Sequence, residues 1–251
     1  RVTPAARLER MATDDIYRGE DGEVAPFAFN ETVARVFPDM IERSVPGYRL
    51  LLELLPLLVR RAVQPGTRVY DLGCSLGAAT LAARRAIAED DVRIVAVDNA
   101  PDMVRRCREV IAADNSRIPV EVLEADVRNL DIERASVVLM IFTLQFIPAE
   151  ERDELIARIH AGMVPGGVLV LAEKLAFDDG ATQQWQDTHH LDFKRAQGYS
   201  DLEIARKRQA LENVLVPDDR DRHHRRLREA GFEQVVDWFQ ALPFSAIAAI
   251  R

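Results

Sequence analysis

The sequence lacks a long apolar run and has few cysteines. Its most apolar stretch, residues 50–63, is short and is interrupted by a proline and by charged side chains, so it does not read as a membrane span. Cys74 and Cys107 are too few for a disulfide framework. Because the first residues also show no secretory leader, we expect a cytoplasmic protein with reduced thiols and no membrane association.

The sequence also lacks an excess of basic residues. It carries 33 Lys and Arg against 41 Asp and Glu, which gives a net charge of −8. Proteins that bind nucleic acid through its phosphates usually show the opposite balance. Residues 220–228 are a local exception, rich in Arg and His, which fits a solvated helix face better than an RNA-binding patch. We therefore expect no direct contact with nucleic acid.

A glycine turn between a strand and a helix is the most informative feature present. The strand-like residues 67–70 lead into Asp71-Leu72-Gly73-Cys74-Ser75-Leu76-Gly77, and an alanine-rich helical run follows at 78–88. Glycines at such a turn let the backbone approach a ligand, and the helix N-terminus offers free N–H groups. A second apolar run, residues 92–97, ends in Asp98, about twenty residues after Gly77, where an acid accepts hydrogen bonds from a ribose. The pattern predicts a nucleoside site.

The details of the turn favour S-adenosylmethionine (SAM) as the nucleoside. The dinucleotide fingerprint needs a middle glycine that is absent here, and the turn opens with Asp71, whose carboxylate suits a sulfonium or ammonium group better than a pyrophosphate. The alternatives are a nicotinamide cofactor and a tight turn that binds nothing.

Strand-like and helical runs alternate along the chain, which predicts an α/β protein with a mostly parallel, doubly wound sheet. Two runs near the end, 234–239 and 244–250, have no helix between them and predict an antiparallel hairpin at one edge. With the SAM-type turn, this arrangement resembles the Rossmann-like class I methyltransferase fold, which we expect over residues 29–251 after a flexible N-terminal segment, residues 1–28. The strands are expected near 68–72, 93–98, 120–125, 136–142 and 168–174, and the helices near 31–44, 48–62, 78–88, 101–113, 149–163 and 223–230.

A long polar and helical insertion, residues 181–217, lies between the fifth strand and the last helix. Insertions at this place lie over the carboxyl ends of the strands, where open α/β sheets bind ligands, so we expect a substrate cap. The cap contains basic residues, which favour an anionic small molecule. His189, His190 and Asp192 lie close together in sequence, but their spacing matches no strong zinc pattern, and we expect no metal.

Several segments resemble the bacterial carboxy-S-adenosyl-L-methionine (carboxy-SAM) synthases. The similarity runs from about Phe29 to the C-terminus and includes the cap. Its segments are VFPDM at 36–40, RSVPGY at 43–48, DLGCSLGAAT at 71–80, FTLQF at 142–146, DFKRA at 192–196 and LENV at 211–214. The resemblance implies that SAM and prephenate give carboxy-SAM, phenylpyruvate and water, in a homodimer. The product would serve a separate enzyme that carboxymethylates hydroxyuridine at the tRNA wobble position.

The resemblance also implies roles for individual residues. Arg208 in the cap matches the family's arginine that binds the new carboxylate. An arginine suits this role because its planar guanidinium can form two hydrogen bonds with one carboxylate. Tyr199 and Arg195 are candidates for the second carboxylate, with a packing role as the alternative. The residues matched to SAM contacts follow the chain from the second helix to the end of the third strand, and they are Tyr48, Gly73, Cys74, Ser75, Asp98, Asn99, Asp126 and Val127.

One position departs from the family. Ile141 stands where the family carries an asparagine that contacts SAM, and its side chain cannot form a hydrogen bond. Two other functions stay open at this point. One is a conventional SAM-dependent methyltransferase acting on a small acid or on RNA, and the other is a SAM-binding partner, without catalysis, of a tRNA-modifying enzyme.

Overall fold

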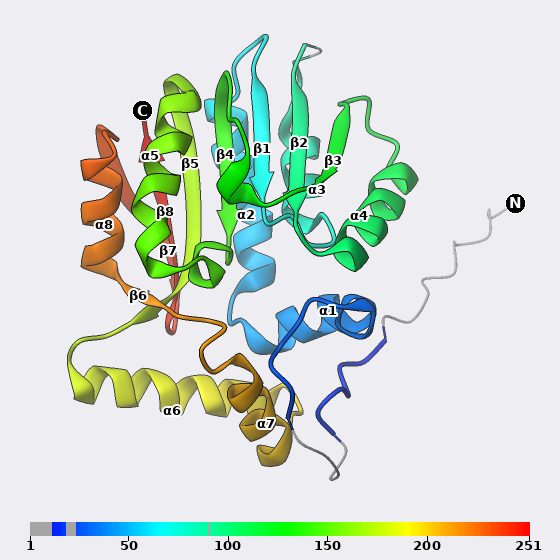
Figure 1. Cartoon of the computed structure of the whole chain (residues 1–251), viewed down its shortest axis with the longest axis vertical. Helices are drawn as coiled ribbons and strands as arrows, with labels where there is room; N and C mark the ends of the chain where they lie inside the picture. Colours follow the sequence, from blue (N-terminus) through cyan, green and yellow to red (C-terminus); the bar gives the residue numbers. More distant parts are fainter. Residues whose placement is uncertain (1–11, 19–23, 90) are drawn as a thin grey trace, which may run out of the picture.

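One mixed sheet forms the centre of the protein in the computed structural model, which describes residues 12–18, 24–89 and 91–251 (Figure 1). The strand order is β3-β2-β1-β4-β5-β8-β7, in which β1 to β5 are parallel and β8 is antiparallel to both β5 and β7. The mostly parallel sheet and the C-terminal hairpin are thereby confirmed. The strands are β1 (Arg68–Leu72), β2 (Arg93–Asp98), β3 (Val120–Glu124), β4 (Ala135–Ile141), β5 (Met163–Ala176), β7 (Gln234–Ala241) and β8 (Phe244–Ile250).

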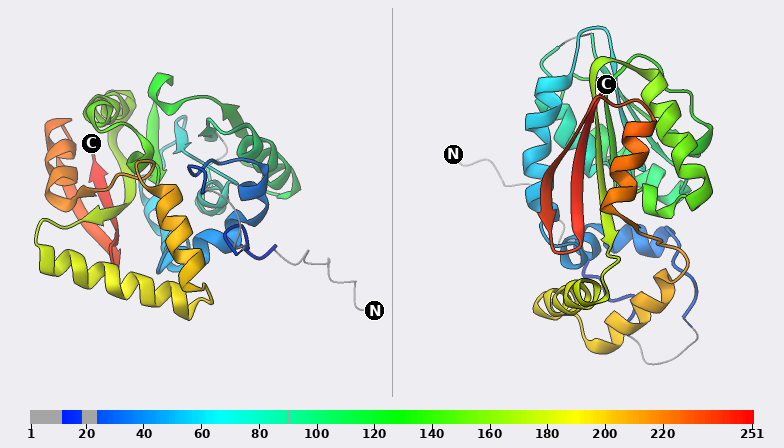
Figure 2. Two further views of the ribbon diagram at one scale, coloured as in Figure 1. Left: turned by 60° about the horizontal axis from the view of Figure 1, so that its bottom comes forward. Right: turned by 90° about the vertical axis from the view of Figure 1, so that its left-hand side faces the viewer.

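Helices cover both faces of the sheet, as Figure 2 shows. On one face, α2 (Tyr48–Ala62) and α3 (Ala78–Ala86) bury Leu55 and Val59 against β1, β2 and β4. On the other, α5 (Arg152–Gly162) and α8 (Arg220–Glu229) bury Ile156 and Leu227. The central strand β4 is buried along nearly its whole length because it is covered on both sides, and all its residues except Ser136 are apolar. A further helix, α4 (Pro101–Ala113), packs next to β3.

Three helices lie beyond the carboxyl ends of the parallel strands. They are α1 (Glu31–Ser44) and the two helices of the cap, α6 (Gly180–Ala196) and α7 (Asp201–Leu211) (Figure 1). Ser200 and Glu203 cap each other's backbone N–H groups at the start of α7. After α7 the chain returns to the sheet, where the short strand β6 (Asp218–Asp219) pairs with β5.

Some boundaries differ from those that the sequence predicts. The helix expected from residue 149 is divided into the 3₁₀ turn η3 (Ala149–Glu151) and α5. The last helix begins at Arg220, three residues earlier than expected, because the Asp219 side chain accepts a hydrogen bond from the Arg222 backbone N–H. Two further 3₁₀ turns, η1 (Val127–Asn129) and η2 (Leu144–Phe146), follow β3 and β4.

The described part of the N-terminal segment packs against the cap, which differs from the flexible segment expected over residues 1–28. The Asp14 side chain is 1% exposed and accepts hydrogen bonds from the Tyr199 hydroxyl and the Lys207 ammonium group. The Phe27 backbone N–H donates to the carbonyl of Ala210 at 2.9 Å. Composition alone did not indicate these contacts, because the partners lie about 185 residues away in the sequence. The rest of the segment, 1–11 and 19–23, lies outside the described residues.

Candidate active site

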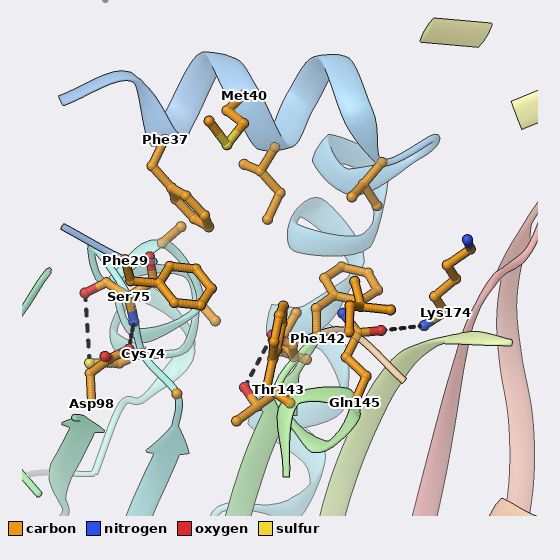
Figure 3. A pocket seen from close by; sticks show the side chains of 18 of the residues that line it. Phe29, Phe37, Met40, Cys74, Ser75, Asp98, Phe142, Thr143, Gln145 and Lys174 are labelled. Carbon is orange, nitrogen blue, oxygen red and sulfur yellow. Dashed lines mark hydrogen bonds between the residues drawn. The ribbon is translucent and has the colours of Figure 1, made fainter. Parts of the chain in front are cut away.

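A cavity of about 580 Å³ lies between the carboxyl ends of the strands, α1 and the cap. Its volume is in the range of small-molecule sites. Its lining includes all the residues matched to SAM contacts apart from Arg208, namely Tyr48, Gly73, Cys74, Ser75, Asp98, Asn99, Asp126, Val127 and Ile141. Figure 3 shows the glycine loop and Asp98 at one end and Lys174 at the other. We refer to these as the nucleoside end and the cap end.

The backbone conformation of the glycine loop requires glycine at position 73. Gly73 has φ of +82°, and a Cβ atom there would lie 2.1 Å from the Thr143 hydroxyl oxygen. The N–H groups of Gly73 and Cys74 both donate to the carbonyl of Val97, at 2.8 and 2.9 Å. Only glycine fits this combination of positive φ and close approach. The turn therefore brings the backbone to the cavity wall at the start of α3.

Asp98 ties the glycine loop to the next strand. One carboxylate oxygen accepts from the Ser75 backbone N–H at 2.8 Å, and the other accepts from the Ala100 N–H at 2.9 Å. Burial raises the pKa of Asp98, while these hydrogen bonds oppose the shift. Each carboxylate oxygen can accept a second hydrogen bond. The predicted ribose contact is compatible with this geometry.

Asp71 lies buried beneath the loop, with its carboxylate accepting from the Thr80 hydroxyl at 2.5 Å. Burial raises its pKa to about 6. Its charge acts on Tyr48, whose pKa is raised first by burial and then by Asp71 and Glu42. The buried carboxylate of Asp71 would attract a cationic ligand beside it, which is the property expected of a sulfonium site.

Asp126 and Val127 begin the turn η1 after β3. The Asp126 carboxylate accepts from the Arg128 guanidinium at 2.6 and 3.0 Å, and these bonds hold the pKa of Asp126 below its usual range. Arg128 is in turn bound to Glu151. The predicted contact of Asp126 with the exocyclic amine of adenine would use a carboxylate that is already oriented by this arginine.

The floor of the cavity is the segment after β4. The Ile141 side chain is half buried among apolar neighbours and offers no hydrogen bond to a ligand. Beyond it, the backbone N–H groups of Thr143, Leu144 and Gln145 donate to the buried carboxyl oxygens of Glu173 at 3.2, 2.8 and 3.1 Å. Burial raises the pKa of Glu173 to about 8. Glu173 thereby fixes residues that line the cavity.

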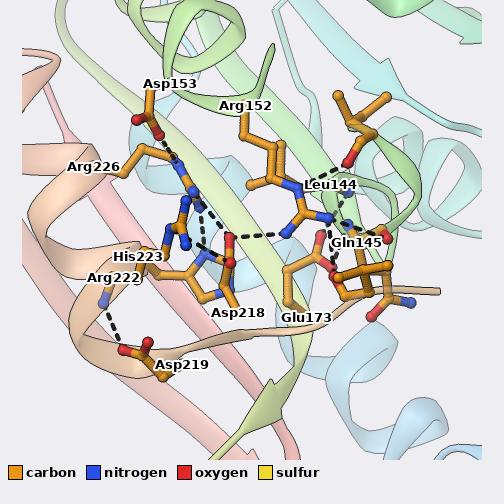
Figure 4. A network of polar contacts seen from close by, with 12 residues as sticks. Leu144, Gln145, Arg152, Asp153, Glu173, Asp218, Asp219, Arg222, His223 and Arg226 are labelled. Carbon is orange, nitrogen blue, oxygen red and sulfur yellow. Dashed lines mark hydrogen bonds and ion pairs between the residues drawn. The ribbon is translucent and has the colours of Figure 1, made fainter. Parts of the chain in front are cut away.

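A buried ion network holds this floor from below (Figure 4). The Arg152 guanidinium, which is 1% exposed, donates to the carbonyls of Ile147 and Val216 at 2.9 Å each. It also pairs with Asp218 at 2.8 Å, and Asp218 pairs with Arg226 at 2.9 Å. The network joins α5, α8 and β6, so the loop below the cavity is connected to the body of the fold.

Aromatic side chains from α1, from the residue before its N-cap and from η2 form a further wall of the cavity. Phe29 makes edge contacts with Phe37 of α1 and Phe146 of η2, with ring centroids 6.0 and 5.4 Å apart. These rings, together with Met40, give the cavity an apolar side (Figure 3). Apolar walls exclude water and strengthen electrostatic interactions inside a site.

Three lysines line the cap end. They are Lys174 at the end of β5, Lys194 on α6 and Lys207 on α7. Burial, together with the charges of Lys207 and Lys174, lowers the pKa of Lys194 to about 7. His190, beside them, binds the Ser44 carbonyl at 2.8 Å, and burial lowers its pKa to about 3, so the ring is neutral at physiological pH.

The three residues predicted to bind carboxylates all lie outside the cavity lining. Arg208 is exposed on α7, and its charge contributes to lowering the pKa of Lys174 and of Lys194. The Tyr199 hydroxyl binds Asp14, and its ring lies 3.9 Å from the Arg43 guanidinium. Arg195 pairs with Asp192 and Asp201 on the surface. For Tyr199 and Arg195 these partners fit the packing role that the sequence left open.

His189, His190 and Asp192 do not converge on one site, because each has a different partner. The His189 ring stacks on Trp185 with centroids 3.9 Å apart, whereas His190 binds the Ser44 carbonyl and Asp192 pairs with Arg195. In the described ranges no three His, Cys, Asp or Glu side chains are arranged to hold a metal ion. No helix in those ranges is long and apolar enough to span a membrane.

The sequence interpretation did not assign Lys174, Glu173 or Phe29 to the site. For Lys174 and Glu173 a signal exists, since they lie near the carboxyl end of the fifth strand, at the sheet edge that carries the glycine loop. Phe29 has no such signal, because it precedes the first helix and reaches the cavity through the packing of α1 against α4 and the glycine loop.

Comparisons with known proteins agree on one family. A model described as a methyltransferase domain matches residues 69–167. Carboxy-SAM synthase of Geobacter sp. is 51% identical over 95% of this chain and 98% of its own length. Those of Pseudomonas putida (KT2440) and Escherichia coli are 53% and 48% identical, over 91% and 95% of this chain and 94% and 96% of their own lengths.

Solved structures support the fold at lower similarity. An O-methyltransferase family protein from Burkholderia thailandensis is 19% identical, with a TM-score of 0.65 over 91% of this chain. Human N-acetylserotonin methyltransferase in complex with SAM is 16% identical, with a TM-score of 0.59 over 88% of it. The chain spans 65% and 55% of those two structures. The fold is that of the class I SAM-dependent methyltransferases, and with curated relatives about 50% identical over nearly its full length, the chain belongs to the carboxy-SAM synthase family.

Proposed function

We propose that this protein converts SAM and prephenate into carboxy-SAM, phenylpyruvate and water. The observation that carries the proposal is that a SAM-type loop and a group of lysines lie at opposite ends of the same cavity. A net-acidic chain that gathers cations at one end of a nucleoside site is suited to an anionic second substrate. The family membership supports the same conclusion.

The nucleoside end would hold SAM without much rearrangement. Asp98 and Asp126 supply acceptors for the ribose and for adenine, and the glycine loop supplies close backbone. Ile141 contributes shape only, so binding would rest on those groups. Asp71, beneath the glycine loop, and Tyr48, on which its charge acts, would lie beside the cationic methionine part.

The chemistry divides between the two substrates. The sulfonium of bound SAM acidifies its methyl C–H bonds, and decarboxylation of prephenate to phenylpyruvate releases CO₂ and hydroxide, which supply the new carboxylate and take up the methyl proton as water. The protein's part is to bring the two molecules together and to exclude bulk water. The aromatic wall of Phe29, Phe37 and Phe146 excludes water, and the Glu173-bound floor fixes the position of the reacting groups.

Arg208 is the proposed holder of the carboxylate in the product. It lies on α7 within electrostatic reach of Lys174 and Lys194. From its exposed position it would turn inward when a carboxylate forms. Further proposals that follow from the family resemblance are a homodimer, a cytoplasmic location, and transfer of the product to a separate enzyme that carboxymethylates hydroxyuridine in tRNA.

The test uses prephenate labelled with ¹³C in the carboxylate that is lost on decarboxylation. Purified protein is incubated with SAM and this prephenate, and the nucleosides are analysed by mass spectrometry. We expect a product heavier than SAM by one labelled CO₂, with one phenylpyruvate formed for each. A methylated acid in place of carboxy-SAM would identify a conventional methyltransferase. Binding of SAM with no turnover of either compound would favour the non-catalytic partner.

A further inference from the structure

The lysines of this chain are confined to one place. The chain has 33 lysines and arginines together, and only Lys174, Lys194 and Lys207 are lysines. All three line the same cavity. They come from three elements, β5, α6 and α7, so helical periodicity does not explain their meeting. Everywhere else the chain uses arginine as its cation, which indicates that this end of the cavity requires the compact charge of an ammonium group.

The three lysines differ in their partners. The Lys207 ammonium group binds the Ser44 hydroxyl at 2.9 Å and Asp14 at 3.3 Å. Within residues 12–18, 24–89 and 91–251, no hydrogen bond or ion pair reaches the ammonium groups of Lys174 and Lys194. Lys207 is therefore a structural cation, and the other two are available to a ligand.

The surroundings of these two lysines are mainly positive. Lys174 is subject to the charges of Asp187 and Arg208, and Lys194 is subject to those of Lys207, Lys174, Arg208 and Asp187. Burial and the positively charged neighbours lower the pKa of both lysines, whereas Asp187 acts to raise it. Among the charged neighbours with the largest effect on them in the described part of the chain, only Asp187 is acidic. A bound anion would offset both the burial and the repulsion.

We propose that Lys174 and Lys194 bind the carboxylates of the dicarboxylate co-substrate and hold it at the cap end, beside the methionine part of SAM. The proposal rests on the proposed function, which requires such a substrate in this cavity. Two independent ammonium groups on different elements suit two carboxylates on one molecule, because each turns freely toward its own carboxylate. Arg208 would then be reserved for the carboxylate of the product.

The first test observes the lysines directly. Protein containing lysine labelled with ¹³C at Cε gives three side-chain signals, which the variants Lys174→Gln and Lys194→Gln assign. Prephenate is added to protein saturated with S-adenosylhomocysteine, which lacks the reacting methyl group. We expect the Lys174 and Lys194 signals to shift and their pKa values to rise, with a smaller shift for Lys207. Saturation with prephenate without a shift of Lys174 and Lys194 would overturn the proposal.

The second test separates binding from folding and from the reaction. Lys174→Gln and Lys194→Gln should each raise KM for prephenate at least tenfold and leave the SAM dissociation constant within twofold of wild type. The matched control is Arg225→Gln, which removes one charge from the exposed face of α8 and should change neither. Lys194→Arg should retain part of the affinity.

The outcomes of these tests distinguish the lysine assignment from the proposed function on which it rests. If wild type forms carboxy-SAM from prephenate and both Gln variants keep its KM, the lysine assignment is wrong and the proposed function stands. If wild type forms no carboxy-SAM, the proposed function fails and the lysine assignment fails with it. In wild type, KM for prephenate should rise as pH increases from 7 to 9, because Lys194, whose pKa is lowered to about 7, loses its charge.

Discussion

The two ends of the cavity are built in different ways. At the nucleoside end, the polar groups belong to the backbone or to acids that are bound to it, as with Asp98 between the Ser75 and Ala100 N–H groups. At the cap end, the polar groups are long side chains on helices, and two of the three lysines carry no partner among the described residues. The first end is arranged before its ligand arrives, whereas the second depends on the ligand for its charge balance.

This difference explains the selectivity that we expect. A pre-arranged end binds the part that SAM, S-adenosylhomocysteine and carboxy-SAM share, so it cannot distinguish them. The cap end distinguishes them, because a carboxylate there meets unbalanced cations. Substitutions at the nucleoside end should therefore affect all three ligands equally, and substitutions at the cap end should affect only ligands with a carboxylate at that position.

The largest effect is expected for Gly73→Ala. The new Cβ would overlap the Thr143 side chain, and φ of +82° disfavours any L side chain. We expect SAM and carboxy-SAM to lose affinity equally, by more than about 100-fold, or about 2.7 kcal/mol, in calorimetric titrations. Gly180→Ala is the control, because its Cβ would meet nothing within 4 Å. A loss confined to one ligand would contradict the division of the cavity.

The next largest effect is expected for Asp98→Ala. The substitution removes the acceptor for the ribose and frees the Ser75 and Ala100 N–H groups, at a cost of about 1–3 kcal/mol in binding of either nucleoside. Asp102→Ala, a carboxylate on α4 outside the cavity lining, serves as the control. Unchanged affinity for both nucleosides in calorimetry would show that Asp98 does not contribute to their binding.

A smaller and selective effect is expected for Arg208→Ala. SAM should bind within twofold of wild type, because it has no group for this arginine. Carboxy-SAM should lose about tenfold, or about 1.4 kcal/mol, since an arginine that starts from solvent gives up part of its pairing energy on turning inward. A competition titration with both nucleosides measures the ratio, with Arg225→Ala as the control. Equal losses for both nucleosides would show that Arg208 does not bind the carboxylate of the product.

The smallest effect is expected for Ile141→Asn. The nucleoside end already offers Asp98, Asp126 and the glycine loop, so a further amide should improve SAM affinity by less than about tenfold. Ile141→Val tests whether the shape of the side chain matters by itself. A gain larger than tenfold would mean that the isoleucine weakens the site substantially.

The same contrast governs how much the sequence could predict. The parallel strands, the C-terminal hairpin and the glycine loop follow from local patterns, and the structure confirms them because β1, the turn and α3 are contiguous in the chain. The cap end could not be assembled in this way. Lys174, Lys194 and Lys207 meet only through tertiary packing, as does Asp14, which binds residues of the cap from the other end of the chain. Burial of Arg152 and Asp218 likewise has no local signal.

The most direct measurement is whether the two ends can be filled at once. Native mass spectrometry of the protein with S-adenosylhomocysteine and prephenate, at concentrations where each is saturating, counts the molecules bound to each chain. The account predicts one of each on the same chain, with affinity for prephenate equal or greater when the nucleoside is present. Mutually exclusive binding, in which either molecule displaces the other, would contradict it.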